Sequence, residues 1–157
     1  MTTTQWLLGF HLVGAFLFVA GAIAVGILQS AAVRRGRPSE IAFLLGLVRA
    51  AVPVVGLGAL LALGFGASLV HRSGFAWDDG WIAASLALWI GSVVLGGIGG
   101  RSARHTRYLA ERFAADGDAP SDELRRALTS PVAQALNYGS LLAALAILAL
   151  MIWRPGA

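Results

Sequence analysis

Residues 11–30 read HLVGAFLFVAGAIAVGILQS, twenty residues without a charged side chain. They belong to a longer uncharged run, 1–33, which is followed by Arg34, Arg35 and Arg37. About 20 apolar residues in an α-helix cross the ~30 Å hydrocarbon core of a bilayer, because each residue adds about 1.5 Å. No basic residue precedes the run, and its apolar core is too long for a cleaved signal peptide. The stretch is therefore predicted to be a retained transmembrane helix.

Three further uncharged runs of similar length follow, at 50–71, 80–100 and 127–153. The whole chain is 57% hydrophobic and only 13% charged, against about 25% charged residues in soluble domains. In lipid, a backbone must satisfy its own hydrogen bonds, and runs without alternating polarity do so as helices rather than as barrel strands. The sequence predicts one all-α domain over residues 1–157, an integral membrane antiparallel four-helix bundle of up-down-up-down topology, with helices at about 4–30, 41–70, 81–100 and 131–153.

The longest connection, residues 101–130, is predicted to be a loop whose first part continues the third helix. The segment GDAPSD, 117–122, interrupts this helix. Ser121 is a suitable N-cap for a short helix DELRRAL, and Ser130 with Pro131 is typical of an N-cap followed by the first helical residue.

The basic residues predict the orientation in the membrane, because arginines in short loops stay in the cytoplasm. All twelve basic side chains are arginines, and ten of them flank the first connection or lie within 101–130. Trp6, Trp77, Trp81 and Trp153 lie at the opposite helix ends, where indole rings favour the headgroup zone. We expect a multi-pass protein of the bacterial inner membrane, with loop 101–130 in the cytoplasm and both termini outside it.

The positive charge also bears on partners. Topology and attraction to anionic lipid account for the arginines, and no segment is left to form a nucleic-acid-reading element. The expected partner is the lipid bilayer, with no nucleic acid. A membrane-protein partner or a homodimer is the further possibility.

Small residues recur on single helix faces, which allows close approach of helices in lipid. Such faces favour packing within one bundle, with dimerisation as the alternative. The two clearest faces belong to the second and third helices and consist of Gly58, Ala62, Gly66, Ser92, Gly96 and Gly100.

Polar residues inside the spans are the best indication of function, because they usually point into a bundle. One group lies toward the cytoplasmic side: Arg49 of the second helix, and Gln134, Asn137 and Tyr138 on one face of the fourth. Pro53 adds to this group, since a helical proline leaves the carbonyl of Arg49 without its donor. These residues predict an inner polar pocket. The alternative is that Arg49 reaches the interface and the amides bond to neighbouring backbones.

A second group lies toward the outer side and contains His11, His71, Asp78 and Asp79. Gly14 and Ala15 beside His11 could make room for a flat ligand, so His11 and His71 are candidate cofactor ligands. His11, His71 and Asp78 are candidate metal ligands by residue type. Because the first two helices run antiparallel, however, Gly66 rather than His71 is level with His11. The alternative is a His11 that bonds to a facing carbonyl or hydroxyl group.

The segment WLLGFHLVGAFLFVAGAIAVG, the arginine-rich first turn and the closing LALMIWRPG resemble a family of bacterial predicted integral membrane proteins of unknown function, whose last helix ends in a basic-Pro motif. A more distant similarity, carried by FHLVGAFLFVAG, is to copper-resistance D proteins and HemJ-type protoporphyrinogen oxidases. That similarity implies a metal or haem ligand at His11. Those oxidases also use a lysine in a later helix, and this chain contains no lysine.

No catalytic group is visible in the sequence: there is no paired intramembrane carboxylate, no nucleophile beside a base, and no metal motif of diagnostic spacing. The sequence therefore favours a small inner-membrane protein that acts by binding or assembly, as an accessory subunit or a transport-related module, without a cofactor. The alternative is a membrane redox protein that binds haem b or copper at His11.

Overall fold

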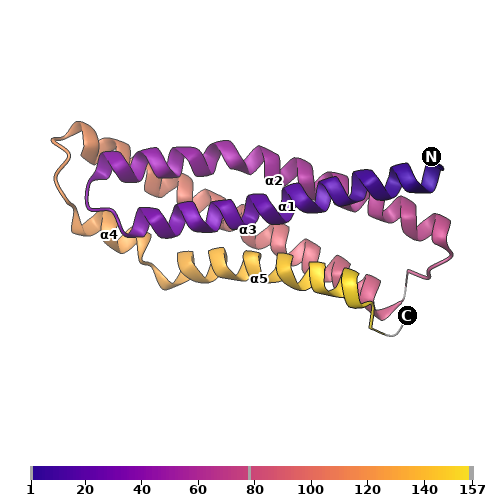
Figure 1. The fold of residues 1–157 in the computed structure, drawn as a ribbon. Helices are drawn as coiled ribbons and strands as arrows, with labels where there is room; N and C mark the ends of the chain where they lie inside the picture. The colour runs from indigo at the N-terminus through magenta and orange to yellow at the C-terminus, as the bar shows by residue number, and fades with distance from the viewer. Residues whose placement is uncertain (1, 78, 156–157) are drawn as a thin grey trace.

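The computed structural model describes residues 2–77 and 79–155, and all of its regular structure in these residues is helical (Figure 1). The helices are α1 (Thr3–Val33), α2 (Pro38–Ser73), α3 (Gly80–Ala115), α4 (Asp122–Leu128) and α5 (Pro131–Trp153). Within the described part of the chain, four helical segments are long and apolar enough to cross a membrane. The predicted membrane helix bundle is confirmed.

The long helices extend beyond the predicted bounds. α1 continues to Val33 and α2 covers Pro38–Ser73, while α3 runs on to Ala115 as one uninterrupted helix. The first two helices end three residues beyond 30 and 70, because hydropathy marks the apolar part of a helix, whereas backbone hydrogen bonding continues into the polar zone. The expected continuation of the third helix into 101–130 agrees with the course of α3. The caps of α4 and α5 are as predicted, since the hydroxyls of Ser121 and Ser130 accept from the backbone N–H groups of Leu124 and Ala133.

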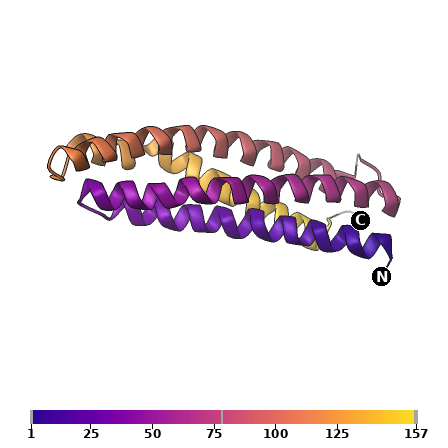
Figure 2. The same cartoon turned by 90° about the horizontal axis from the view of Figure 1, so that it is seen from above.

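The bundle consists of two antiparallel hairpins. In the first, α1 and α2 cross (Figure 1), and glycines bring their backbones together: a Cβ atom on Gly14 would lie 2.5 Å from the backbone nitrogen of Ala62. Gly58 meets the backbone of Phe18 equally closely. In the second hairpin, α3 and α5 pack through leucines, with Leu95 against Gly139 and Leu136 against Gly99. Figure 2 shows the same arrangement from above.

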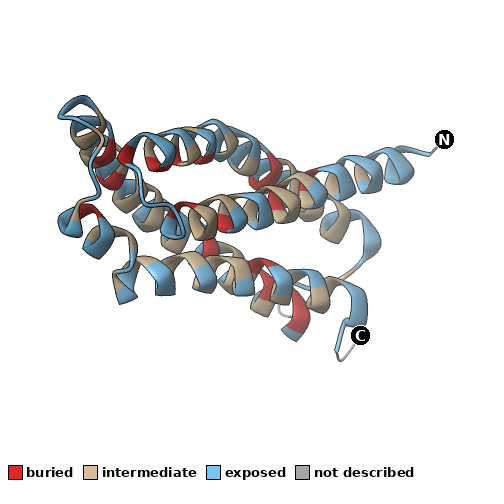
Figure 3. Cartoon of the chain, turned by 60° about the vertical axis from the view of Figure 1, so that its left-hand side comes forward, coloured by how far each residue is buried: buried red, intermediate tan, exposed pale blue. Residues whose placement is uncertain are grey.

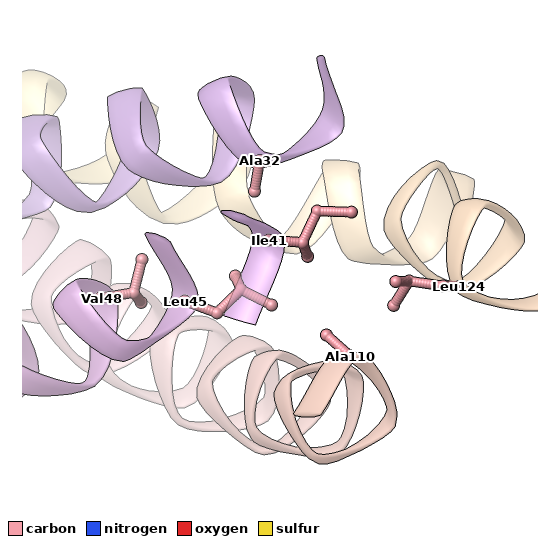
Figure 4. Packing of buried hydrophobic residues seen from close by; sticks show 6 residues of the cluster. All are labelled: Ala32, Ile41, Leu45, Val48, Ala110 and Leu124. Carbon is pink, nitrogen blue, oxygen red and sulfur yellow. The ribbon is translucent and has the colours of Figure 1, made fainter. Parts of the chain in front are cut away.

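Few side chains are fully buried, and they lie between the helices (Figure 3). One cluster lies near the α1–α2 turn and combines Ala32, Ile41, Leu45, Val48, Ala110 and Leu124 (Figure 4). A second cluster lies near the middle of the bundle axis and consists of Phe18, Ala59 and Ala144. Most other large apolar side chains are exposed, as expected for a surface that contacts lipid.

Both termini lie at one end of the bundle, and the α1–α2 turn and α4 lie at the other, which we call the arginine-rich end (Figure 1). At the terminal end, the guanidinium of Arg154 lies 5.7 Å from the ring centre of Phe75 and 5.6 Å from that of Trp81. These cation–π contacts connect the end of α5 to the α2–α3 connection. The arginine of the closing WRPG motif therefore has a structural role.

At the arginine-rich end, Asp118 connects the α3–α4 loop to the start of α2. Its carboxylate accepts hydrogen bonds from the backbone N–H of Ser39 at 2.8 Å and from the Ser39 hydroxyl at 2.7 Å. These bonds, hydroxyl first, lower the pKa of Asp118 from its ordinary 3.8, with a smaller contribution from the charge of Arg37. The carboxylate thus caps a helix from a distant part of the chain.

We expect this cap to be lost in acid. A carboxyl with a lowered folded-state pKa stabilises the fold above its unfolded value of 3.8, and the contribution disappears as the pH falls through the lower folded value. Asp118→Asn tolerates the positive φ of 56° at this position, because asparagine adopts left-handed conformations. The melting temperature of this variant in detergent should lie below that of the wild type above pH 3.8, with the difference shrinking at lower pH. Asp116→Asn is the control, and an equal loss in both variants would contradict the assignment.

Candidate functional site

A cavity of about 270 Å³ lies between the two hairpins in the half of the bundle nearer the arginine-rich end. Its walls come from every helix, and Ala127 and Leu128 of α4 border it at the arginine-rich end. Toward the middle of the bundle axis, the cavity is lined by Val25, Val52 and Leu95. The cavity is slightly smaller than the ~300 Å³ at which pockets for drug-sized ligands begin. It is thus large enough for a small ligand or for part of a lipid.

Glycines of α3 create much of this space. Gly96, Gly99 and Gly100 line the cavity, and a Cβ atom on Gly96 or Gly100 would have no neighbour within 4 Å. The small face predicted on this helix is therefore only partly a packing face: Ser92 is buried, while Gly96 and Gly100 border open space. The face on α2 does pack, since Gly58, Ala62 and Gly66 all contact α1.

The polar lining consists mainly of side-chain amides. Gln134, Asn137 and Tyr138, which the sequence places on one face of the last helix, all line the cavity. Gln29 of α1 lines the same cavity from the other hairpin. In the described residues, none of these four side chains hydrogen-bonds to another protein group. Gln29 and Asn137 are half-buried, while Gln134 and Tyr138 are exposed, so all four are accessible to a ligand, a lipid headgroup or water.

Arg49 is not part of this group. Its side chain is exposed, and the cavity is lined from α2 by Leu45, Val48 and Val52 instead. The reason is rotational: Arg49 follows Val48 on the helix and is turned about 100° from it. Depth along the helix axis placed Arg49 beside the amides, but the phase of the helix directs it elsewhere.

The cationic residue at the cavity is Arg34, at the end of α1. Ion pairs in the described residues join Arg35 to Glu40 at 3.9 Å and Arg107 to Glu111 at 3.5 Å, and neither includes Arg34. No carboxylate lines the cavity within the described residues. The site is therefore positively charged at one end.

Sequence reasoning missed Gln29 and Arg34. The signal for Gln29 was present, because its amide stands near the end of an otherwise apolar run at a depth comparable to that of Gln134. In the sequence, Arg34 is one of several clustered arginines. Only the packing of α1 shows that Arg34 lines the cavity and that Arg35 does not.

His11 lies outside the cavity, in the α1–α2 interface. Its Nδ1–H donates a 2.8 Å hydrogen bond to the carbonyl oxygen of Ala62, and its ring lies against Gly66, whose missing side chain leaves the space. This contact agrees with the prediction that His11 and Gly66 lie at the same height along the two antiparallel helices. The backbone of α2 fills the space beside Gly14, which we had expected to accommodate a flat ligand.

The structure does not bring His71 to His11, since His71 is exposed in the last turn of α2. Asp78 lies outside the described residues. Among those described, there is no group of three or more His, Cys, Asp or Glu side chains that could hold a metal ion. Of the candidate cofactor ligands, His11 is the one that lies between helices, where it bonds to the carbonyl oxygen of Ala62.

The chain matches the protein family described as "Predicted integral membrane protein (DUF2269)" over residues 5–155. No curated protein and no solved structure matches the chain. The more distant similarity to copper-resistance D and HemJ-type proteins gains no support from these comparisons.

Proposed function

The chain belongs to this family of predicted integral membrane proteins, and from that premise we propose that it acts by binding, with the cavity between its hairpins as the ligand site. The observation that carries the proposal is the set of unpaired amides, Gln29, Gln134 and Asn137, around one cavity between helices that are long and apolar enough to cross a membrane. An apolar cavity with a few convergent polar groups is the usual form of a small-molecule site. An accessory subunit or a transport-related module could use such a site.

A cavity-filling substitution tests the proposal. In Gly96→Leu, the new side chain enters open space without disturbing a helix contact, so the bundle should fold and the site should close. Gly97→Leu is the control, because Gly97 is exposed, does not line the cavity and also has open space around it. Native mass spectrometry of the full chain purified in mild detergent should show a bound small molecule or lipid in the wild type and in Gly97→Leu, with at least about a tenfold loss in Gly96→Leu, as expected when ~1.4 kcal/mol of binding is removed.

Two outcomes would contradict this proposal. One is a wild-type protein that carries no bound mass after mild purification and acquires none when lipid is added. The other is equal retention in Gly96→Leu and Gly97→Leu, which would place any bound molecule outside the cavity.

We also propose that the protein lies in the bacterial inner membrane with the arginine-rich end in the cytoplasm, because basic loops are retained there. The cysteine-free chain allows a direct test with single cysteines at exposed positions. An impermeant maleimide added to intact spheroplasts should label Thr3→Cys and Ser73→Cys, and should reach Gly36→Cys and Ala119→Cys only after permeabilisation. The opposite pattern would invert the orientation.

The alternative function is a haem- or copper-binding redox protein centred on His11. The hydrogen bond from Nδ1–H to Ala62 supports it, because such a bond fixes the ring and leaves the Nε2 lone pair of the neutral form available to a metal. A cofactor would supply the redox chemistry, and His11 would act as its ligand. Protein from cells supplied with haem precursor and copper should then show a Soret band or bound copper that His11→Ala loses. A colourless, metal-free parent would exclude this function.

A further inference from the structure

We infer that the ligand of the cavity is an anionic lipid, with its headgroup at Arg34 and one acyl chain in the apolar part of the cavity. The inference rests on the proposed binding function and adds the chemical class of the ligand. It combines the charge at one end of the cavity, the amides along its wall and its opening to the bundle surface.

The charge favours an anion. Arg34 lines the cavity, and no ion pair in the described residues neutralises it. Two other arginines nearby, Arg35 and Arg107, each have a glutamate partner. A guanidinium next to phosphate oxygens forms charge-assisted hydrogen bonds, which are about twice as strong as neutral ones.

The polarity of the lining changes along the bundle axis. From Arg34 to Val25, α1 rises nine residues, or about 14 Å, and the lining changes over this distance from arginine through Gln29 to apolar side chains. The far part is formed by Val25, Val52 and Leu95, together with Ser140, whose hydroxyl donates to the carbonyl oxygen of Asn137 in its own helix. A charged head, a polar linkage region and an acyl chain follow one another in the same order in a phospholipid.

The cavity is also accessible from the side of the bundle. Tyr138, on its wall, is 50% exposed, and Val33 at its edge is 38% exposed. Lining residues that are also surface residues mean that the space opens between the hairpins, where a lipid could enter from the bilayer. The arginine-rich end is the end that the arginine distribution assigns to the cytoplasmic leaflet, whose anionic lipids bind basic pockets between helices.

The test compares two neighbouring arginines. Arg34→Gln removes the charge at the cavity, while Arg35→Gln removes an adjacent exposed charge that does not line it. Binding of phosphatidylglycerol and of phosphatidylcholine to the full chain in neutral detergent is titrated by native mass spectrometry. We expect Arg34→Gln to weaken phosphatidylglycerol binding about tenfold, the loss typical of one charged hydrogen bond, and Arg35→Gln to change it little. Phosphatidylcholine, whose trimethylammonium group offsets the charge of its phosphate, should bind more weakly to the wild type and lose less affinity than phosphatidylglycerol in Arg34→Gln.

Inorganic phosphate distinguishes a lipid from a free anion. If the lipid is the ligand, phosphate should displace phosphatidylglycerol only by general salt screening, as sulfate does at equal ionic strength. Displacement specific to phosphate would overturn the lipid assignment in favour of a soluble anion.

The Gly96→Leu variant separates the two proposals. Equal responses of Arg34→Gln and Arg35→Gln, combined with loss of both lipids in Gly96→Leu, would overturn the anionic class and leave the cavity as a binding site. Lipid binding that Gly96→Leu does not alter would overturn both proposals.

Discussion

Substitution of Gly58 by leucine is expected to destabilise the bundle by about 3 kcal/mol, at the upper end of the cost of overpacking a core. A Cβ atom at Gly58 would lie 2.5 Å from the backbone nitrogen of Phe18 and 2.9 Å from the carbonyl oxygen of Gly14. Neither neighbour is a flexible side chain that could turn away. The backbones of α1 and α2 would therefore have to separate along the whole crossing.

Gly56→Leu is the matched control, because Gly56 lies on the same helix and a Cβ atom there would have no neighbour within 4 Å. Unfolding of both variants in mixed micelles, titrated with a denaturing detergent and followed by tryptophan fluorescence, gives the comparison. Equal stability of Gly58→Leu and Gly56→Leu would show that the crossing seen here is not the packing of the folded protein.

Truncation of Leu124 to alanine is expected to cost about 3 kcal/mol, within the range for a buried leucine. Leu124 is 1% exposed and contributes most of what α4 buries against Ile41 and Ala110 (Figure 4). A seven-residue helix is too short to persist without such packing. Loss of this anchor should release α4 from the end of the cavity that Ala127 and Leu128 border.

Limited proteolysis at the α3–α4 loop and thermal unfolding measure this effect together. Leu142→Ala, at a position 65% exposed, should change neither. If Leu124→Ala is cleaved no faster than Leu142→Ala, then α4 is held by its connections rather than by the buried leucine.

The candidate site could be predicted only in part. Gln134, Asn137 and Tyr138 share a helix face by spacing alone, and that face does line a cavity. The residues that complete the site are Gln29 and Arg34 from α1, and the expected Arg49 is exposed instead. Which residues of two helices share a cavity depends on their relative rotation, and sequence spacing describes only one helix at a time.

The position of His11 could also be predicted only in part. The antiparallel arrangement and the helix rise sufficed to place it level with Gly66, because both depend on length alone. That the ring bonds to the carbonyl of Ala62, and that the backbone of α2 occupies the space beside Gly14, depends on how closely the two helices approach.

The sequence by itself determined that this is a membrane protein with four long helices, where each apolar run lies, and which serines begin α4 and α5. These properties follow from local requirements: a backbone in hydrocarbon must bond to itself, and a helix start needs an acceptor for its free N–H groups. Only the tertiary structure decided the helix rotations, the close approach at Gly14 and Gly58, and the cavity beside Gly96. The physical reason is that lipid and protein interior are both apolar, so a side chain that contacts lipid and one that contacts another helix look alike in the sequence.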